Sequence, residues 1–343
     1  MGFVKEPSVM RPSFHPRLIN DPFSDPGLFV PFLYQKRALM FDLGDLHNLP
    51  PRDLLKVTHI FVTHTHMDHF IGFDSLLRVF LGREKEPHIF GPPAFLAQVE
   101  GKLAGYTWNL VDDYDYRLRL KVTEVHSNRT LTRRYTCQDR FRPASDEWER
   151  PFSGILWQEP AFRVEATLLD HQTPCLGFSL KEHFYVNISN EALRDLGLSA
   201  GPWLNQFKTA LYEEWDLGGE FVAEWEDDGR KRERRFVLGD LARKIAGISP
   251  GQRITYITDI IGSSQNTEKV LRLAENADQL FIEAAFLERD KDIAHRKYHL
   301  TAREAGTLAR RAGAKQVTPF HYSPRYCHQA EALEREVREA FQQ

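Results

Sequence analysis

The sequence predicts a layered α/β fold in which helices cover sheets. Segments with the apolar, β-branched composition of strands alternate with segments of helical length along most of the chain. Such alternation is typical of folds that pack helices against sheet faces. A second observation is that histidine and acidic residues directly follow several of the predicted strands. Loops after strands cluster at one sheet edge in such folds, so these residues mark a candidate site.

Composition places the chain among ordinary globular proteins. It has 343 residues, 42% hydrophobic and 27% charged, with a formal net charge of -3. A nearly neutral chain has no global attraction to nucleic acid, so a polyanionic partner needs a local patch of cations. Three scattered cysteines without CxxC spacing argue against a disulfide framework or a thiolate zinc site. The amino terminus has no apolar signal segment and no stretch is long enough to span a membrane, so we expect a cytoplasmic protein.

The first half of the chain predicts a hairpin and then alternating strands and helices. Two strands over 28–34 and 37–42 are joined at Gln35 and Lys36. The segments that follow are a helix over 51–55, a strand over 57–63, one buried helix over 70–81, a strand over 88–90, a helix over 93–103 and a strand over 118–125.

The strand over 57–63 delivers an HxHxDH motif. Strand side chains alternate with a period of two, so His64 and His66 leave its end on the same side. The turn after them brings Asp68 and His69 to the same point. Imidazole and carboxylate ligands suit zinc, manganese or ferrous iron, and two separable pairs of ligands favour two metal ions. The alternative is a surface turn that happens to hold three histidines, but the strand-to-helix context favours a metal site.

Two segments interrupt the alternation. Residues 126–152 contain six arginines and are interpreted as an elaborated hairpin or loop, which either faces phosphates or is a solvated surface. Residues 213–235 are strongly charged and predict a protruding hairpin. Its basic run, 230–235, is the most positive local feature of the chain, and a solvated turn explains it about as well.

The last third returns to a regular pattern. A capping box at Thr301 and Glu304 opens a helix that runs to Arg311, with Gly313 as its stop. Between the two interrupting segments, strands are predicted over 162–169, 176–180 and 184–188. From Arg253 onward, the other predicted segments are strands over 254–258, 279–282 and 315–320 and helices over 266–276 and 331–341.

Four polar residues lie just past these strands: His171, Asp259, Glu283 and His321. The sheet-edge argument makes them candidates to meet the HxHxDH motif. Taken one at a time, such residues are more often caps or turn residues, so this alternative stays open on the residues alone.

The HxHxDH motif after Phe61-Val62-Thr63 resembles that of the metallo-β-lactamase superfamily. Within it, the order and spacing of further segments resemble ribonuclease Z, the endonuclease that trims the 3′ trailer from tRNA precursors. The resemblance covers roughly residues 57–110 and 160–330. Its segments are Leu169-Asp170-His171, Gly177-Phe178, Tyr256-Ile257-Thr258-Asp259, Phe281-Ile282-Glu283-Ala284-Ala285-Phe286, His299-Leu300-Thr301-Ala302 and Phe320-His321-Tyr322-Ser323-Pro324-Arg325-Tyr326.

The resemblance implies a four-layer αββα sandwich in one domain, residues 1–343, with two divalent metal ions, zinc first among them, at one edge between the sheets. The segment over 197–237 occupies the place of the flexible arm that grips tRNA in that family, and 126–152 is a second elaboration. The ligand sets implied are His64, His66 and His171 for one ion, Asp68, His69 and His321 for the other, with Asp259 as the bridge.

The chemistry implied is phosphodiester hydrolysis by a hydroxide held between the two metals. Asp68 orients the attacking water and accepts its proton. His299 protonates or stabilises the leaving oxygen, and Glu283 orients His299. The alternative for His299 is a structural partner of the capped helix that follows it.

Two further functions are kept beside this one. The first is a hydrolase of the same fold that cleaves a small-molecule ester, lactone or thioester, because fold analogy cannot choose among these chemistries. The second is a non-catalytic RNA-binding or scaffold protein with a dead site, against which the complete set of seven ligands argues. For partners, the resemblance implies a phosphodiester substrate such as a tRNA precursor and a homodimer, and the residues predict no membrane association.

Overall fold

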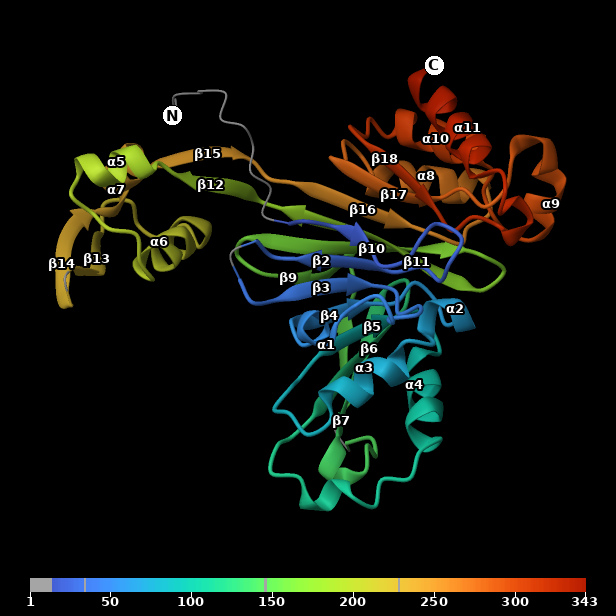
Figure 1. Ribbon diagram of the computed structural model, residues 1–343, viewed down its shortest axis with the longest axis horizontal. Helices are drawn as coiled ribbons and strands as arrows, with labels where there is room; N and C mark the ends of the chain where they lie inside the picture. The colour runs from blue at the N-terminus through green and yellow to red at the C-terminus, as the bar shows by residue number, and fades with distance from the viewer. Residues whose placement is uncertain (1–13, 34, 145–146, 228) are drawn as a thin grey trace. The chain divides into compact units, whose positions relative to one another are not determined.

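The computed structural model describes residues 14–33, 35–144, 147–227 and 229–343. This part of the chain groups into two compact units (Figure 1). The larger comprises Phe14–Leu156, Val164–Leu180 and Arg253–Gln343, and the smaller comprises Trp157–Arg163 and Lys181–Gln252. The single domain expected from the sequence stays a prediction.

Eight described strands of the larger unit form one sheet whose strand order follows the sequence. The strands are β1 (Arg17–Leu18), β2 (Leu28–Pro31), β3 (Ala38–Phe41), β4 (Val57–Phe61), β5 (His88–Gly91), β6 (Arg119–Val125), β7 (Arg129–Thr136) and β8 (Trp148–Pro151). From β3 to β6 neighbouring strands are parallel, whereas the outer pairs are antiparallel. Parallel strands are covered on both faces, which explains why all four residues of β3 are buried.

A second sheet of six described strands has the order β18-β17-β16-β11-β10-β9. These strands are β9 (Ile155–Gln158), β10 (Phe162–Asp170), β11 (Pro174–Glu182), β16 (Arg253–Ile257), β17 (Gln279–Glu283) and β18 (Val317–Phe320). The last three are parallel, so their carboxyl ends lie at the same edge.

Helices of the larger unit cover the outer faces of the two sheets (Figure 1). The helices are α1 (Pro51–Leu54), α2 (Met67–Phe70), α3 (Phe73–Phe80), α4 (Phe95–Ala104), α8 (Ser264–Leu273), α9 (Lys291–Arg296), α10 (Ala302–Arg311) and α11 (Ala330–Gln342). Side chains of α3 and α4 pack on the first sheet, and those of α8, α10 and α11 pack on the second. The capping box at Thr301 and Glu304 is confirmed at the start of α10.

Aromatic rings fill the space between the two sheets. Phe41 of the first sheet lies 5.6 Å from the ring of Phe178 and 5.9 Å from that of Tyr256, both on the second sheet. Burial of each such ring contributes roughly 1.5–3 kcal/mol from the apolar surface that it removes from water. The predicted four-layer αββα sandwich is therefore confirmed.

The buried helix expected over 70–81 is instead two short helices, α2 and α3, so that prediction is wrong in its bounds. The chain between them passes close to the loop after β3, where a Cβ on Gly72 would lie 2.2 Å from the carbonyl oxygen of Gly44. A Cβ on Gly44 would in turn lie 2.7 Å from the carbonyl oxygen of Asp68. Two glycines therefore allow the loop after β3 to pack against the metal motif.

The smaller unit has its own core, formed by β12 (Phe184–Ile188), α5 (Asn190–Asp195), α6 (Trp203–Tyr212), β13 (Glu220–Asp227), β14 (Arg230–Val237), α7 (Leu238–Ile245) and β15 (Ala246–Pro250). Trp203, Phe207 and Phe221 pack together within it. The hairpin predicted over 213–235 is found as the antiparallel pair β13 and β14. None of the described helices in either unit is long and apolar enough to cross a bilayer.

Candidate metal centre

The nine residues predicted as ligands or catalytic groups all lie in the larger unit, and the structure brings them together. Most of them follow the carboxyl end of a strand, as the sheet-edge argument requires. The residues are His64, His66, Asp68 and His69 after β4, His171 after β10, Asp259 after β16, Glu283 at the end of β17, His299 before α10 and His321 after β18.

One group of four side chains collects around Asp259. Ligand atoms of His64, His66, His171 and Asp259 lie within 4.8 Å of one another. Asp259 Oδ2 is 3.3 Å from His64 Nε2 and 3.4 Å from His171 Nε2. The other ring nitrogen of His171, Nδ1, lies 2.7 Å from the carbonyl oxygen of Tyr298, and this contact fixes the orientation of the ring.

A second group lies beside the first. Ligand atoms of Asp68, His69 and His321 also lie within 4.8 Å of one another. His321 Nε2 is 3.2 Å from Asp68 Oδ2. Asp259 reaches this group too, since its Oδ1 is 2.8 Å from His321 Nδ1 and its Oδ2 is 3.3 Å from His69 Nε2. The carboxylate of Asp259 is therefore shared between the two groups.

Three buried ring nitrogens in these groups make no hydrogen bond: His64 Nε2, His69 Nε2 and His321 Nδ1. A buried polar atom without a partner is costly, so native proteins rarely keep one without a function. All three nitrogens face Asp259, and together with its oxygens they make the mixed nitrogen and oxygen donor set that zinc and related divalent ions prefer. The residues present therefore fit a divalent metal.

The centre holds charges of both signs that shift one another's pKa. Burial chiefly lowers the pKa of His64, to about 4. Burial alone would also lower the pKa of His69, but the carboxylates of Asp259 and Asp42 outweigh it and raise that pKa to about 10. Burial would raise the pKa of Asp68, yet His321 and His69 lower it to about 2. For Asp259 burial is again outweighed, here by His321 and His69, which hold its pKa well below the usual range.

Asp42 supports the centre and was given no role from the sequence. Its fully buried carboxylate accepts hydrogen bonds from the backbone N–H of Thr63 at 2.7 Å and from the Tyr256 hydroxyl at 3.0 Å. It also lies 2.9 Å from His69 Nδ1. Such a carboxylate fixes the ring orientation of the histidine and directs Nε2 toward the centre. The only sequence signal was its position at the end of a predicted strand.

Asp42, Asp259 and His321 are among the residues of this region that have left-handed backbone conformations. The φ angles are 59° for Asp42, 52° for Asp259 and 58° for His321. Non-glycine residues in this region cost of the order of 1 kcal/mol or more each and persist where the surrounding structure holds them. Each of these residues lies within two residues of the end of a strand, and its side chain contacts other residues of the centre.

His299 and Glu283 form a pair at the side of the centre. His299 Nδ1 lies 2.8 Å from Glu283 Oε2, and Glu283 Oε1 accepts the backbone N–H of Ile260 at 2.7 Å. Burial would lower the pKa of His299, but the Glu283 carboxylate outweighs it and raises that pKa. The side chain of His299 is 18% exposed, so the ring reaches the surface of the centre.

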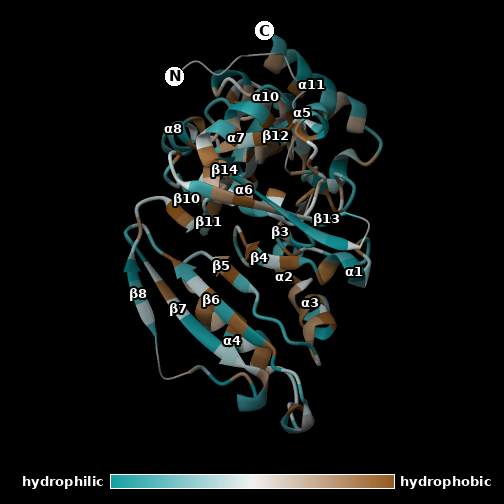
Figure 2. Ribbon diagram, turned by 90° about the vertical axis from the view of Figure 1, so that its left-hand side faces the viewer, coloured by the Kyte–Doolittle hydropathy of each residue, from teal (hydrophilic) through white to brown (hydrophobic). Residues whose placement is uncertain are grey.

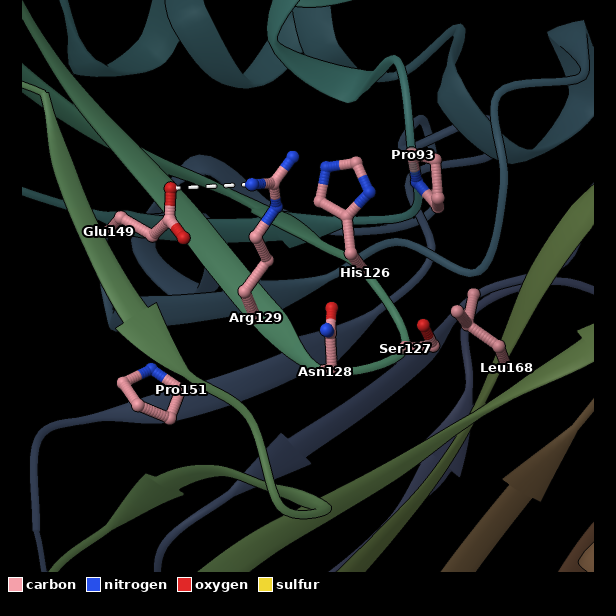
Figure 3. A pocket seen from close by; sticks show the side chains of 8 residues that line it. All are labelled: Pro93, His126, Ser127, Asn128, Arg129, Glu149, Pro151 and Leu168. Carbon is pink, nitrogen blue, oxygen red and sulfur yellow. Dashed lines mark hydrogen bonds and ion pairs between the residues drawn. The ribbon is translucent and has the colours of Figure 1, made fainter.

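A hollow of about 830 Å³ opens at the carboxyl end of β6, beside the edge that carries the centre (Figure 3). His126 and Asn128, from the turn between β6 and β7, contribute to its wall. Arg129 is the one described cation in the lining, and its guanidinium lies 3.5 Å from the carboxylate of Glu149. The positive charge of this hollow is therefore compensated.

Comparison with known proteins agrees with this geometry. A family model described as a beta-lactamase superfamily domain matches residues 229–322. Ribonuclease Z of Deinococcus radiodurans is 34% identical over 291 residues, which are 84% of this chain and 83% of that protein. Ribonuclease Z of Geobacillus kaustophilus is 30% identical over 311 residues, 88% of this chain and 82% of that protein.

A crystal structure of a metallo-β-lactamase fold protein from Bacillus subtilis matches with a TM-score of 0.53 at 15% identity, over 93% of this chain and 86% of that one. Fold and site thus define a metal-dependent hydrolase with the metallo-β-lactamase fold. Within this class the chain belongs to the ribonuclease Z family, and it is an enzyme of the endoribonuclease type.

Proposed function

We propose that this protein hydrolyses an RNA phosphodiester, that of the 3′ trailer of a tRNA precursor, with two divalent ions, zinc first among the candidates. The observation that carries the proposal is the sharing of Asp259 between two groups of ligand atoms, each within 4.8 Å. His64, His66 and His171 would hold one ion, Asp68, His69 and His321 would hold the other, and Asp259 is within reach of both groups. A homodimer remains part of the proposal on the family resemblance alone.

When bound, divalent ions would supply positive charge that lowers the pKa of a water molecule and neutralises charge on a phosphoryl oxygen. The chain's own residues then handle the protons. The Asp68 side chain is 42% exposed while its Oδ2 lies 3.2 Å from His321 Nε2, so one oxygen is fixed and the carboxylate still reaches solvent. Asp68 orients the attacking water and accepts its proton.

His299 serves the leaving group. Its Nδ1 donates to Glu283, which fixes the ring and leaves the proton on Nε2 available for the leaving oxygen. Glu283 is fully buried and is itself held by the backbone of Ile260, so the pair has one orientation. A positioned acid of this kind contributes typically about 10²- to 10⁴-fold to the rate.

The test is a paired assay of metal-loaded protein on a 3′-extended tRNA precursor and on a small chromogenic phosphodiester. We expect wild type to cleave both and Asp68→Ala to lose at least roughly 10²-fold in kcat on both. Metal content measured by elemental analysis should be about two ions per chain in wild type and lower in Asp68→Ala, because the variant lacks a ligand.

The matched control is Asp292→Ala, which removes an exposed carboxylate of α9 outside the centre and should change neither rate nor metal content. Cleavage of the small diester alone would leave the metal chemistry intact and exclude the RNA substrate. Cleavage of neither substrate by protein with full metal content would refute the phosphodiesterase and favour an ester, lactone or thioester.

A further inference from the structure

The arginine-rich segment 126–152 divides its cations between two faces of the first sheet. α4 packs on one face of β6, where Arg133 pairs with Glu100 and Glu147 at 2.9 and 2.6 Å. Arg129, on the same face as Arg133, lies beside Glu149. The cations of the helix-covered face are therefore compensated by nearby carboxylates.

The opposite face carries Lys121, Arg134 and Arg150, which we call the β6–β8 cationic face together with Trp148. Strand pairing sets Lys121 against Arg134, and Thr130 against Arg150. Thr132 pairs with Trp148, so all these side chains leave the sheet on one side. Figure 2 shows this part of the sheet with α4 behind it, so that helix does not cover the cationic face.

These cations lack the compensation seen on the helix side. Within the described residues, no carboxylate lies within 4.0 Å of Lys121 or Arg150. Arg134 lies over the ring of Trp148 at 4.8 Å, and its only described acidic neighbour is Glu86, at 4.0 Å. The buried Nε of Arg134 makes no hydrogen bond. The face is therefore a cluster of positive charge with an aromatic ring and threonine hydroxyls between the cations.

The pKa values of Lys121 and His88 are both lowered, in part by the positive charges of this face. Burial and then the charges of Arg150 and Arg134 lower the pKa of Lys121, against the opposing carboxylate of Glu86. Burial and then Lys121, His59 and Arg150 hold the pKa of His88 well below its usual range.

The cationic face begins at the edge that carries the metal centre. β4, β5 and β6 are parallel, so the carboxyl end of β6 and the HxHxDH motif lie at one edge. Arg150 is at that end, opposite Thr130 of β7. Arg134 is four residues farther along β7 than Thr130, which is about 14 Å at about 3.4 Å per residue. The face spans about four stacked nucleotides at about 3.4 Å each. β8 lies four strands from β4, about 19 Å across the sheet.

We infer that the β6–β8 cationic face binds the backbone of a single-stranded stretch of the RNA substrate that extends beyond the cleaved bond. Cations supply salt-dependent contacts to phosphates, and Trp148 with the Arg134 guanidinium offers a platform on which a base stacks. A sheet face with exposed aromatic and cationic side chains is a common surface for single-stranded RNA. This inference rests on the proposed function.

The experiment compares two triple variants with the same change in net charge. Lys121→Gln/Arg134→Gln/Arg150→Gln removes the cationic face. Arg140→Gln/Arg272→Gln/Lys315→Gln removes three cations of the same unit that pair with Asp112, Glu268 and Asp278. The measurements are RNA affinity across a salt series, with a non-cleavable 3′-extended RNA as probe, and hydrolysis of the small diester.

We expect the slope of log K against log salt to fall by about 2 in the first triple variant, at about 0.7 per lost phosphate contact, and to stay unchanged in the second. Hydrolysis of the small diester should be unchanged in both variants, because this substrate is too small to reach the β6–β8 cationic face. Equal slopes in the two variants would overturn the inference, as would a matching loss on the small diester, which would indicate damage to the centre. Absence of all cleavage by wild type would instead refute the proposed function.

Two single variants test the inference even if the triple variant does not fold. Arg150→Gln changes an exposed side chain and should lower the slope by about 0.7. Trp148→Leu should weaken binding without changing the slope, since stacking releases no counterions. An unchanged affinity in Trp148→Leu would exclude a stacked single strand.

Discussion

The first sheet has two polar regions of opposite character. In the candidate metal centre, the carboxylates of Asp259 and Asp42 lie beside His69 and raise its pKa to about 10 against the effect of burial. One strand away, His88 is also buried, but its charged neighbours are Lys121 and Arg150, and its pKa lies well below the usual range. Without metal, the pKa values of two buried histidines of one sheet are thus shifted in opposite directions, because carboxylates outweigh burial at His69 whereas cations add to burial at His88. Burial alone does not define a histidine's role.

The largest expected effect is the loss of a carboxylate from the first region. Asp42→Ala leaves the Thr63 N–H, the Tyr256 hydroxyl and His69 Nδ1 without their acceptor in a buried site. We expect the free energy of unfolding to fall by roughly 3–5 kcal/mol and metal affinity to fall about 10- to 100-fold. Urea denaturation and metal titration measure the two effects.

The control for Asp42→Ala is Asp45→Ala, which changes an exposed residue three positions along the same loop. Its loss in free energy of unfolding should be well under half of that in Asp42→Ala. Equal losses in the two variants would show that the carboxylate of Asp42 does not organise the centre.

A smaller effect is expected from His88 in the second region, and it depends on pH. Because the folded-state pKa of His88 is lowered, the unfolded chain binds its proton first as pH falls below about 6.5. The stability that neutral His88 provides is complete above that pH and is lost as pH falls toward the folded-state pKa, by up to about 1.4 kcal/mol per unit. Urea denaturation at pH 7.5 and 5.5 should therefore show a smaller loss in His88→Gln than in wild type. Equal losses of stability between pH 7.5 and 5.5 in wild type and His88→Gln would contradict a lowered pKa of His88.

The smallest effect is expected from a substitution in the charged hairpin formed by β13 and β14. Acidic and basic residues face each other there, as in the pairs Glu226 with Lys231 and Asp227 with Arg230. Arg235 is exposed and lies 3.1 Å from Glu220. Arg235→Gln should change stability by at most about 0.5 kcal/mol and leave the salt slope of RNA binding unchanged. A decrease in the salt slope as large as that expected for Arg150→Gln would indicate that RNA contacts this hairpin as well.

The sequence predicted that the candidate site residues lie together, and local rules determine most of that clustering. Side-chain alternation placed His64 and His66 together, and the carboxyl ends of strands placed His171, Asp259 and His321 at one edge. Asp42 also follows a predicted strand, but its hydrogen bonds were not indicated by that position, least of all the one from Tyr256, which is 214 residues away in the chain. Only the packing of the two sheets brings that pair into contact.

The arginine-rich segment shows the other limit of the sequence. Six arginines over 126–152 were evident, but a count does not say which of them find carboxylates. The register of β7 against β6 and β8 decides this, because it places Arg133 on the helix side and Arg134 on the open side. A shift of one residue would exchange the two faces. Register in turn depends on contacts between strands, which the composition of a segment does not contain.

The contact between Asp68 and His321 joins residues that are 253 positions apart. During synthesis, the ribosome makes the HxHxDH motif long before β18, so the growing chain carries only part of the candidate site for most of its elongation. The second group of ligands forms only when the last strand joins the second sheet. Contacts of such long sequence separation form late in folding. The group of Asp68, His69 and His321 therefore assembles only after β18 has been made, and a product truncated before β18 lacks it.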